Sequence, residues 1–473
     1  MAFLLGGANS ASGGYEISNS LRFGVDTKLS FTQGTPTSRR IWTYSLWLKR
    51  SALGDIQASF LSFGNSDYFD LRFEDSSPND RILIYISDGA GTDLRTSRLF
   101  RDPSAWYHIV IASDTTDGTA GDRTRIYVNG VEETSFDSEN QPAQNFDYAG
   151  LESGDAMVVG NRYTGSHFFN GYIAEAHFVD GQQLTPSSFG ETDEDSGIWK
   201  PKKYTGTYGT NGFFLEFKQT GTSQNSSGIG ADTSGNDNHF AVTNLAATDV
   251  TTDTPTNNFC TMNSLTNSEA TFSEGNTEID HNGSAGRFIV STFEVNKSKW
   301  YFEAKLLNYS GDSRPTIGLS QSHKSFKSTL VVASQGANGV YFLPESDTYQ
   351  SNSATAITDV DTSPASNDIY HFAFDLDNLK FYIGKGNTWY HSSDPSAGSN
   401  GLAIAVSDYY GVATAANNTS SDSAANNDWQ FNFGNPAFAI SSSNADANGY
   451  GNFEYAVPSG FYALCTKNLA EFG

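Results

Sequence analysis

Arg125-Ile-Tyr-Val-Asn-Gly-Val-Glu-Glu-Thr134 decides the fold class of this chain, because it predicts a tight β-hairpin. β-Branched and aromatic side chains lead into Asn129-Gly130, and both turn residues tolerate the positive φ that a two-residue hairpin needs. Further Asn-Gly pairs begin at Asn170, Asn211, Asn282, Asn338, Asn400 and Asn448. The hairpin and these pairs predict short antiparallel strands that are joined by turns.

The segments around this hairpin have the same character. Residues 81–86, 106–111 and 213–217 are rich in β-branched and aromatic side chains and are too short for buried helices. No segment has the periodicity of an amphipathic helix. Strands without interleaved helices predict an all-β chain of two antiparallel β-sandwich (jelly-roll) domains.

Composition limits the class of partner. The 473 residues include 53 acidic and 28 basic side chains, which give a formal charge of −25, and aromatic residues make up 14%. Aromatic content of this size argues against disorder. The acidic charge argues against binding to nucleic acid, because phosphates would be repelled. Since no apolar run reaches the roughly 18–20 residues of a spanning helix, no membrane insertion is expected.

Composition also divides the chain. The prediction is an N-terminal arm at residues 1–20, a first sandwich at 21–217, a polar linker at 218–265 and a second sandwich at 266–473. Ser, Thr, Asn, Gly and Asp dominate the linker, which explains its assignment. The opening MAFLLGG is too short for a signal-peptide core, so no cleaved signal is expected.

The first sandwich resembles a concanavalin-A-like (laminin-G-type) lectin domain. Four motifs occur in the order typical of that family, and one of them is the hairpin described above. Trp47 in the first motif is expected to point into the core. The motifs are Thr43-Tyr-Ser-Leu-Trp-Leu48, Trp106-Tyr-His-Ile-Val110, Arg125-Ile-Tyr-Val-Asn-Gly130 and Phe169-Asn-Gly-Tyr-Ile-Ala-Glu-Ala-His-Phe-Val-Asp-Gly181.

The second sandwich is similar to a SPRY-like domain. The similarity includes a predicted hairpin over residues 369–384 and a closing strand that ends in Asn432-Phe-Gly434. The motifs are Lys299-Trp-Tyr-Phe-Glu-Ala304, Pro315-Thr-Ile-Gly-Leu319, residues 369–384 and Trp429-Gln-Phe-Asn-Phe-Gly434.

Three further motifs resemble bacteriophage virion proteins: Phe3-Leu-Leu-Gly6, Asp253-Thr-Pro-Thr-Asn-Asn-Phe259 and the C-terminal residues 458–469. This resemblance implies a virion structural protein, such as a tail fibre or appendage, that binds a host-surface glycan or neighbouring virion subunits. It implies location in the virion, assembly in the host cytoplasm and a homo-oligomer, with a trimer as the guess. The alternatives are a capsid-decorating fibre and a polysaccharide-degrading appendage.

Catalysis is not expected. A retaining glycosidase needs two carboxylates about 5–5.5 Å apart, and the nearest pattern, Glu191-Thr-Asp-Glu-Asp-Ser196, ends in Ser and is predicted to be a loop. The eight histidines are scattered singly, so His108, His177 and His371 are expected to be hydrogen-bonded sheet residues. A solvated acidic turn is the alternative interpretation of residues 191–196.

Ligand candidates are few. No cofactor is required, but calcium is possible, because loop carboxylates suit a hard cation; the metal candidates are Asp180, Asp114 and Asp122. Aromatic residues near predicted turns could stack on sugars, although core packing is the alternative for each. These aromatic candidates are Tyr163, Trp389, Tyr390, Tyr409 and Tyr410.

Cys260 and Cys465 lie far apart in the sequence and have no metal-binding spacing. The expected state is two buried thiols, since free cysteine is among the most buried residue types. A single long-range disulfide is the alternative.

Overall fold

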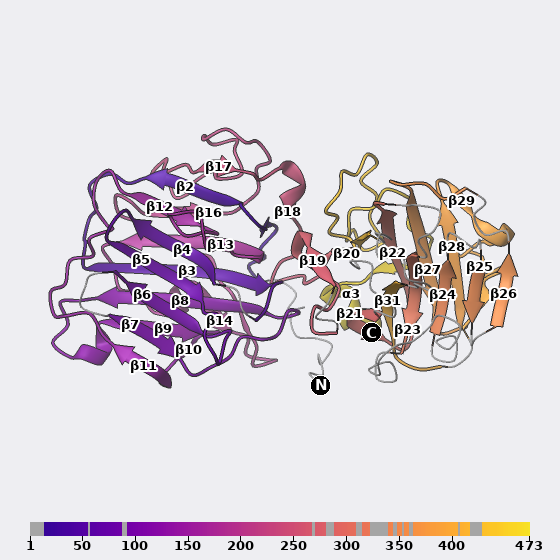
Figure 1. The fold of residues 1–473 in the computed structure, drawn as a ribbon, viewed down its shortest axis with the longest axis horizontal. Coiled ribbons are helices and arrows are strands. Elements are labelled where there is room, and N and C mark those ends of the chain that lie inside the picture. Colours follow the sequence, from indigo (N-terminus) through magenta and orange to yellow (C-terminus); the bar gives the residue numbers. More distant parts are fainter. Residues whose placement is uncertain are drawn as a thin grey trace, which may run out of the picture. The chain divides into compact units, whose positions relative to one another are not determined.

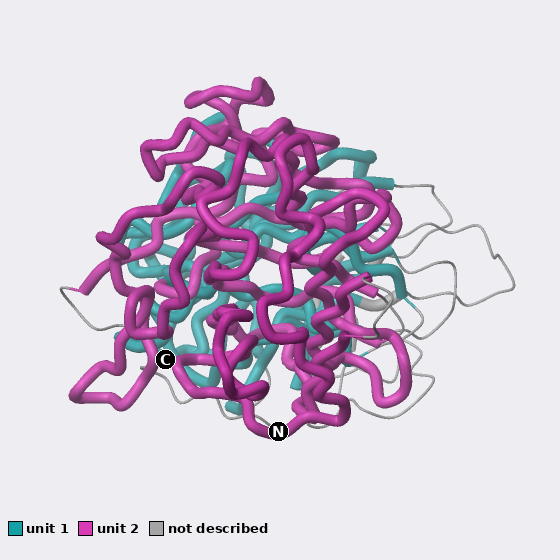
Figure 2. The backbone as a smooth tube through the Cα atoms, turned by 90° about the vertical axis from the view of Figure 1, so that its left-hand side faces the viewer, with its two compact units in different colours: residues 1–10, 257–473 teal, residues 11–256 magenta. Residues whose placement is uncertain are grey.

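The computed structural model describes residues 14–54, 57–87, 92–266, 270–280, 288–308, 315–321, 339–343, 348–351, 354–358, 363–404, 407–416 and 428–473. They form two compact units (Figures 1 and 2). Unit 2 contains the described residues up to Thr256, and unit 1 contains those from Asn257 onward. None of the helices in the described ranges combines the length and hydropathy that crossing a membrane requires. The first 13 residues of the expected arm lie outside the described residues.

Unit 2 consists mainly of two antiparallel sheets. Sheet A contains β1 (Ser20–Phe23), β3 (Ile41–Arg50), β8 (Trp106–Asp114), β9 (Thr124–Val128), β10 (Val131–Glu132), β13 (Gly171–Asp180), β16 (Phe213–Leu215) and β18 (Val250–Thr251). Sheet B contains β2 (Lys28–Thr32), β4 (Ala58–Gly64), β5 (Tyr68–Phe73), β6 (Ile82–Ile86), β7 (Asp93–Thr96), β11 (Phe136–Asn140), β12 (Ala156–Val159) and β17 (Ala241–Thr243). The strand orders are β10-β9-β8-β3-β13-β1-β18, with β16 beside β13, and β11-β7-β6-β5-β4-β12-β2-β17.

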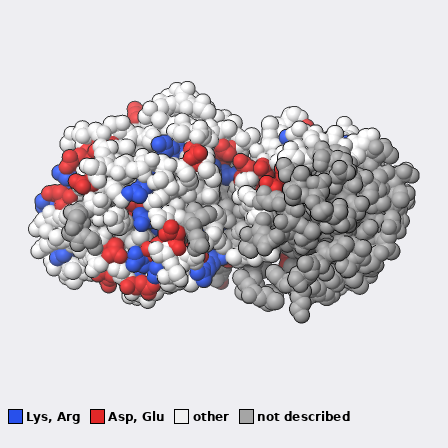
Figure 3. Space-filling model, in the orientation of Figure 1, with Lys and Arg blue, Asp and Glu red and all other residues white. Residues whose placement is uncertain are grey.

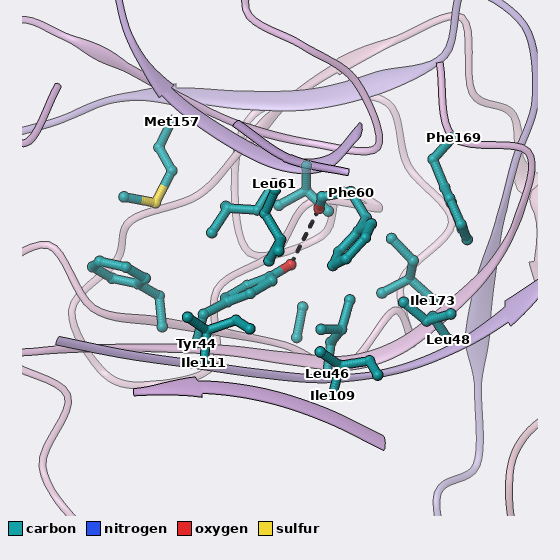
Figure 4. Packing of buried hydrophobic residues seen from close by; sticks show 14 of the residues in the cluster. Tyr44, Leu46, Leu48, Phe60, Leu61, Ile109, Ile111, Met157, Phe169 and Ile173 are labelled. Carbon is teal, nitrogen blue, oxygen red and sulfur yellow. Dashed lines mark hydrogen bonds between the residues drawn. The ribbon is translucent and has the colours of Figure 1, made fainter. Parts of the chain in front are cut away.

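Alternation along the strands builds the core of unit 2. Leu46 and Leu48 of β3 point into one cluster of buried residues with Phe60 and Leu61 of β4. The hydroxyl of Tyr44, in the same cluster, donates to the Phe60 carbonyl oxygen at 3.4 Å (Figure 4). This packing and the pairing of the strands confirm the predicted all-β class.

The hairpin from which the sequence analysis started is present. β9 and β10 pair with Val128 opposite Val131. Asn129 has a φ of 49° and Gly130 a φ of 80°, which is the pair of left-handed residues that a two-residue turn between twisted strands requires. The prediction for residues 125–134 is confirmed in its turn and its register.

Trp47 does not point into the core, and that prediction is wrong. It lies on the opposite face of β3 with Trp106 and Tyr172, in a second buried cluster that Tyr15 and Trp199 help to cover. Its ring stacks on His108 at 4.7 Å. Sheet A therefore buries apolar residues on both faces. For that reason, the apolar character of Trp47 did not show which face of β3 packs against sheet B.

His108 and His177 are hydrogen-bonded sheet residues, as expected. Trp199 Nε1 donates to His108 Nδ1 at 2.9 Å, and His108 Nε2 lies 2.9 Å from the Ser45 hydroxyl. Burial lowers the pKa of His108 to about 3, so the ring is neutral, carries its proton on Nε2 and donates it to Ser45. His177 Nδ1 lies 2.9 Å from the Tyr208 hydroxyl.

The segment expected to be a linker differs from the prediction, because residues 218–256 belong to unit 2. β17 pairs with β2, and β18 pairs with β1. Ile229, Phe240 and Leu245 of this segment are buried in the core of unit 2. Asn236 and Asn238 donate to backbone carbonyls of residues 209–212. Hydrogen bonds supplement the few apolar residues that this segment buries, and so small a number of apolar residues in a polar composition looked like a linker.

Two further strands, β14 (Gly190–Thr192) and β15 (Trp199–Pro201), form a separate hairpin in unit 2. Glu191 therefore lies on a short strand, and its expected position in a loop is wrong. The 3₁₀ helices among the described residues are η1 (Ala120–Asp122), η2 (Pro186–Ser188), η3 (Ala247–Asp249), η4 (Glu274–Asn276) and η5 (Tyr390–Ser392).

Unit 1 also contains two sheets. The first contains β19 (Thr271–Ser273), β20 (Glu278–Asp280), β22 (Lys299–Leu306), β27 (Ile369–Asp375), β28 (Lys380–Lys385), β29 (Thr388–Trp389), β30 (Leu402–Ala403), β32 (Trp429–Asn432) and β33 (Tyr462–Ala463). The second contains β21 (Phe288–Val295), β23 (Pro315–Ser320), β24 (Gly339–Leu343), β25 (Thr348–Ser351), β26 (Ala354–Thr358) and β31 (Tyr410–Ala416). Their orders are β19-β20-β32-β22-β27-β28-β29, with β30 beside β28 and β33 beside β22, and β21-β31-β23-β24-β25-β26.

Several predictions for unit 1 can be compared with this structure. The expected hairpin at residues 369–384 is the pair β27 and β28. Cys260 and Cys465 are free and buried, which confirms the expected state. The chain ends in a helix, α3 (Thr466–Phe472), that the sequence analysis did not predict.

Candidate functional site

The outer face of sheet B carries a polar row on β5. Phe69, Leu71 and Phe73 point into the core. Alternation places Tyr68, Asp70 and Arg72 on the opposite face, where β6 contributes Tyr85 directly opposite Asp70. Sheet B therefore brings an aromatic and charged set together on the face that points away from its own core.

Asp70 is fully buried on this face. Its Oδ2 accepts from Arg72 Nη1 at 2.7 Å and lies 3.4 Å from His167 Nδ1. Burial alone would raise the pKa of Asp70, but His167, Arg72 and Ser59 together hold it below its usual value. The carboxylate is therefore charged and is stabilised by its neighbours, which is the opposite of a general acid.

The loop between β12 and β13 reaches over this row. Arg162 and Gly165 close a turn through the Gly165 N–H, which donates to the Arg162 carbonyl at 2.8 Å, and Gly165 has a φ of 76°. The turn presents Tyr163, whose ring centroid lies 5.1 Å from that of Tyr68. Tyr85 lies on the other side of Tyr68, at 5.8 Å. We call Tyr68, Tyr85 and Tyr163, which are all half-buried, the tyrosine cluster.

The same loop borders a cleft of about 450 Å³. His167 takes part in both features, since it contacts Asp70 and lines the cleft. The other lining residues are Val25, Gln57, Asp75, Ser166, Phe168 and Asn170. A few convergent polar groups beside apolar surface are typical of ligand sites.

A second buried carboxylate, Glu74, follows β5 directly. Its Oε2 accepts from Arg81 at 2.9 Å and pairs with Arg95 at 2.7 Å. Asp70 and Glu74 are thus each bound by arginine, and the lowered pKa of Asp70 is the opposite of the raised pKa that glycoside hydrolysis requires of its acid.

The structure separates the five aromatic candidates. Tyr163 belongs to the tyrosine cluster. Tyr410 is core, with 1% of its surface exposed, and Tyr390 packs on the same core cluster of unit 1. Trp389 is half-buried, with its ring centroid 4.2 Å from that of His371. Tyr409 is 48% exposed. Only Tyr163 lies beside other ring and charged groups of the candidate site.

The metal candidates do not converge. Among the described residues, no group of three or more His, Cys, Asp or Glu side chains could hold a metal ion. Asp180 Oδ2 accepts from the N–H groups of Thr37 and Asn211, and its Oδ1 from that of Ser38. These donors occupy the oxygens that a cation would need, so Asp180 does not fit calcium and fixes loop backbone instead.

The other two metal candidates have local partners. Asp114 accepts from the backbone N–H of Thr116 at 2.9 Å and from its hydroxyl at 2.6 Å. Asp122 pairs with Arg125 at 2.5 Å. Each carboxylate is thus used within its own turn.

Asp180→Asn should destabilise unit 2 by about 1–2 kcal/mol. The amide NH₂ group that replaces one carboxylate oxygen cannot accept a hydrogen bond, so at least one backbone N–H group loses its acceptor. Asp122→Asn is the control, since Asp122 is 39% exposed and forms a surface pair, whose loss costs at most about 1 kcal/mol. Urea unfolding of both variants measures the difference. If calcium raised the urea midpoint of the wild-type protein and a chelator lowered it, the assignment of Asp180 to a structural role without calcium would be contradicted.

The carboxylates of the glycosidase alternative are also committed to structure. Asp193 Oδ1 accepts from the Ser196 N–H and hydroxyl, and its Oδ2 pairs with Lys200 at 2.9 Å. Lys200 and Ser196 hold the pKa of Asp193 below its usual range. Glu191 lies 3.7 Å from the same lysine. Residues 193–198 are thus the charged turn that joins β14 to β15.

Sequence reasoning missed most of the site. Tyr68, Asp70 and Arg72 showed a signal, since apolar residues alternate with polar ones throughout Tyr68-Phe-Asp-Leu-Arg-Phe73. That pattern predicts a strand with a polar outer face. The contact of His167 with Asp70 joins residues far apart in the sequence, and no local pattern indicates it.

Comparison with known proteins agrees with this fold. Residues 23–188 match the model of the concanavalin A-like lectin/glucanases superfamily, which confirms the resemblance of the first sandwich. No curated protein sequence matches the chain.

Three solved structures show the range of similar folds. The SPRY domain of human HERC1 is 10% identical, with 36% of this chain and 92% of that chain covered and a TM-score of 0.26. The heptameric SAP-like pentraxin of Limulus polyphemus is 15% identical, with 36% and 80% covered and a TM-score of 0.27. Domain 4 of AbnA, an extracellular GH43 arabinanase of Geobacillus stearothermophilus in complex with arabinotriose, is 19% identical, with 31% and 64% covered and a TM-score of 0.24.

Proposed function

We propose that this chain is a glycan-binding component of a bacteriophage virion, and that the outer face of sheet B is its binding site. The observation that carries the binding proposal is the tyrosine cluster beside the charged Asp70–Arg72 pair and the cleft at His167. Aromatic rings offer apolar faces to sugar rings, while charged side chains and His167 supply hydrogen-bond partners for hydroxyls.

The virion setting rests on the sequence motifs at both ends of the chain and at residues 253–259. Host attachment by a tail fibre or appendage would account for both the virion-type motifs and the lectin-like domain. Acidic and basic side chains are interspersed over the visible face of unit 2 (Figure 3), and a mixed surface with a net charge of −25 suits a protein that must stay soluble in many copies. Neighbouring virion subunits are the proposed partners, in a homo-oligomer.

The proposed activity is binding without hydrolysis. This rests on Asp70, whose pKa His167, Arg72 and Ser59 hold below its usual value, so that it is not suited to donate a proton. Incubation with host polysaccharide should therefore release no reducing sugar. Release that is lost on Asp70→Asn would favour the polysaccharide-degrading alternative instead.

Tyr163→Ala should weaken glycan binding about tenfold or more, because a ring of the tyrosine cluster is lost at the centre of the site. Tyr409→Ala is the matched control, since that tyrosine is more exposed but lies in unit 1. A glycan array followed by titration calorimetry on the full chain measures both. Loss of binding in the Tyr409 variant alone would place the site in unit 1 and contradict the proposal.

A further inference from the structure

Arg162 holds an unusual position among the arginines of unit 2. Its guanidinium carbon lies 4.2 Å from the ring centroid of Tyr68 and 5.9 Å from that of Tyr163. Its Nε is buried and has no hydrogen-bond partner. Within the described ranges, no ion pair joins Arg162 to a carboxylate. The charge is thus held in place by aromatic rings and is not neutralised by an acid.

The other arginines of unit 2 show how unusual this is. In a chain with 53 acidic side chains, an arginine readily finds a carboxylate. Ion pairs to Asp or Glu are formed by Arg39, Arg40, Arg50, Arg72, Arg81, Arg95, Arg98, Arg101 and Arg125. Arg22 and Arg123 instead donate to backbone carbonyl oxygens. The buried carboxylate of this face, Asp70, already pairs with Arg72 at 2.7 Å and lies 3.4 Å from His167 Nδ1.

The geometry of Arg162 suits an anion supplied by a ligand. Stacking on Tyr68 uses the flat face of the guanidinium and fixes its orientation. The N–H groups at its edge are then free to form the paired hydrogen bonds that carboxylates and phosphates accept. Because the guanidinium of Arg162 is held in position before binding, little side-chain entropy is lost when a ligand binds.

We infer that unit 2 selects acidic glycans and that Arg162 binds their anionic group, an inference that rests on the proposed glycan-binding function of the same face. The tyrosine cluster contacts the sugar rings, and Arg162 decides between acidic and neutral sugars. Arg72, on the same face, is already paired with Asp70, so the selectivity is assigned to Arg162.

The test uses the full chain and a panel of oligosaccharides that contain uronate or sialate. Each is matched with its methyl ester, which keeps the sugar but removes the charge, and with a phosphorylated oligosaccharide of equal length. Wild-type protein should bind the acids at least tenfold more tightly than the esters. Arg162→Gln should remove that preference, and Arg162→Lys should restore only part of it, because lysine keeps the charge but not the fork.

Arg98→Gln is the control variant, because Arg98 is 47% exposed and pairs with Glu133 in the same unit. It should keep the preference for acids. Tight binding of the uronates identifies a carboxylate as the ligand group, and tight binding of the phosphorylated set identifies a phosphate; both support the inference. Equal binding of acids and esters would overturn it and leave the proposed function intact. Binding to no member of the panel would overturn both.

Discussion

Asp253→Asn is expected to destabilise unit 2 by about 3–5 kcal/mol, because it breaks a buried ion pair by removing the charge of one partner. Lys49 Nζ lies 2.5 Å from Asp253 Oδ2, and neither side chain has more than 1% of its surface exposed. Trp106 Nε1 donates to the other carboxylate oxygen at 3.2 Å. The Asp253 carbonyl oxygen also accepts from the Ser20 hydroxyl at 2.6 Å.

The matched control is Asp237→Asn, in the same polar segment, where the carboxyl is 90% exposed. This change should alter stability by no more than about 0.5 kcal/mol. Hydrogen exchange of β3 and β13 amides in the full chain, measured over a series of urea concentrations, reports the opening of unit 2 by itself. Equal protection in the two variants would mean that residues 218–256 are attached to unit 2 without stabilising it.

The Asp253 variant concerns the segment at which the sequence and the structure place the domain boundary differently: the first sandwich was predicted to end at residue 217, but unit 2 extends to Thr256. The alternation of apolar residues predicted the strands and the 125–134 hairpin correctly, because each of those elements buries side chains on a regular period. Residues 218–256 instead bury only a few apolar residues, Ile229, Phe240 and Leu245, and specific polar contacts hold the segment beside them. Asp232, for example, accepts from the N–H groups of Phe214, Ser234 and Asn238. Such partners lie at irregular spacings, both near and far along the chain, and leave no periodic signal.

The candidate site has the same limitation. Tyr163 could be proposed from its position near a turn, and the polar alternation of β5 marks Asp70 and Arg72 as outward residues. What makes these residues a site is the loop over sheet B, which brings Arg162 to Tyr68 and His167 to Asp70. Those contacts depend on the β12–β4–β5 order of the sheet, and strand order cannot be read from local patterns.

Glu303→Gln is expected to destabilise unit 1 by about 2–4 kcal/mol at pH 5. Glu303 is fully buried on β22. Its Oε1 accepts from the Tyr301 hydroxyl at 2.9 Å and the Tyr455 N–H at 2.8 Å. Its Oε2 accepts from Asn432 Nδ2 at 3.0 Å and the Glu454 N–H at 2.9 Å. A glutamine amide nitrogen cannot accept, so at least one backbone N–H loses its partner, at about 1–3 kcal/mol each.

The pH dependence separates this role from simple packing. Burial raises the pKa of Glu303 to about 7, although the N–H groups of Tyr455 and Glu454 oppose the shift. A carboxyl whose pKa is raised on folding contributes stability that is complete below its ordinary value of 4.5 and is lost as the pH rises to about 7. The protonated acid keeps every partner, because the Tyr301 hydroxyl can turn and accept its proton.

Glu303 should therefore contribute a loss of about 3 kcal/mol to unit 1 between pH 4.5 and 7. Asp428, whose pKa burial raises to about 6, adds its own loss in this range, so Glu303→Gln should lack only the Glu303 part of the slope and differ most from wild type at the acidic end. The two cysteines provide the measurement, since both are buried in unit 1, so their labelling in urea by a pyridyl disulfide reports the unfolding of that unit. Glu471→Gln, an exposed carboxyl in α3, is the control and should keep the wild-type slope. If Glu303→Gln keeps it too, then another group titrates, and Glu303 serves only as a hydrogen-bond acceptor for residues 454 and 455.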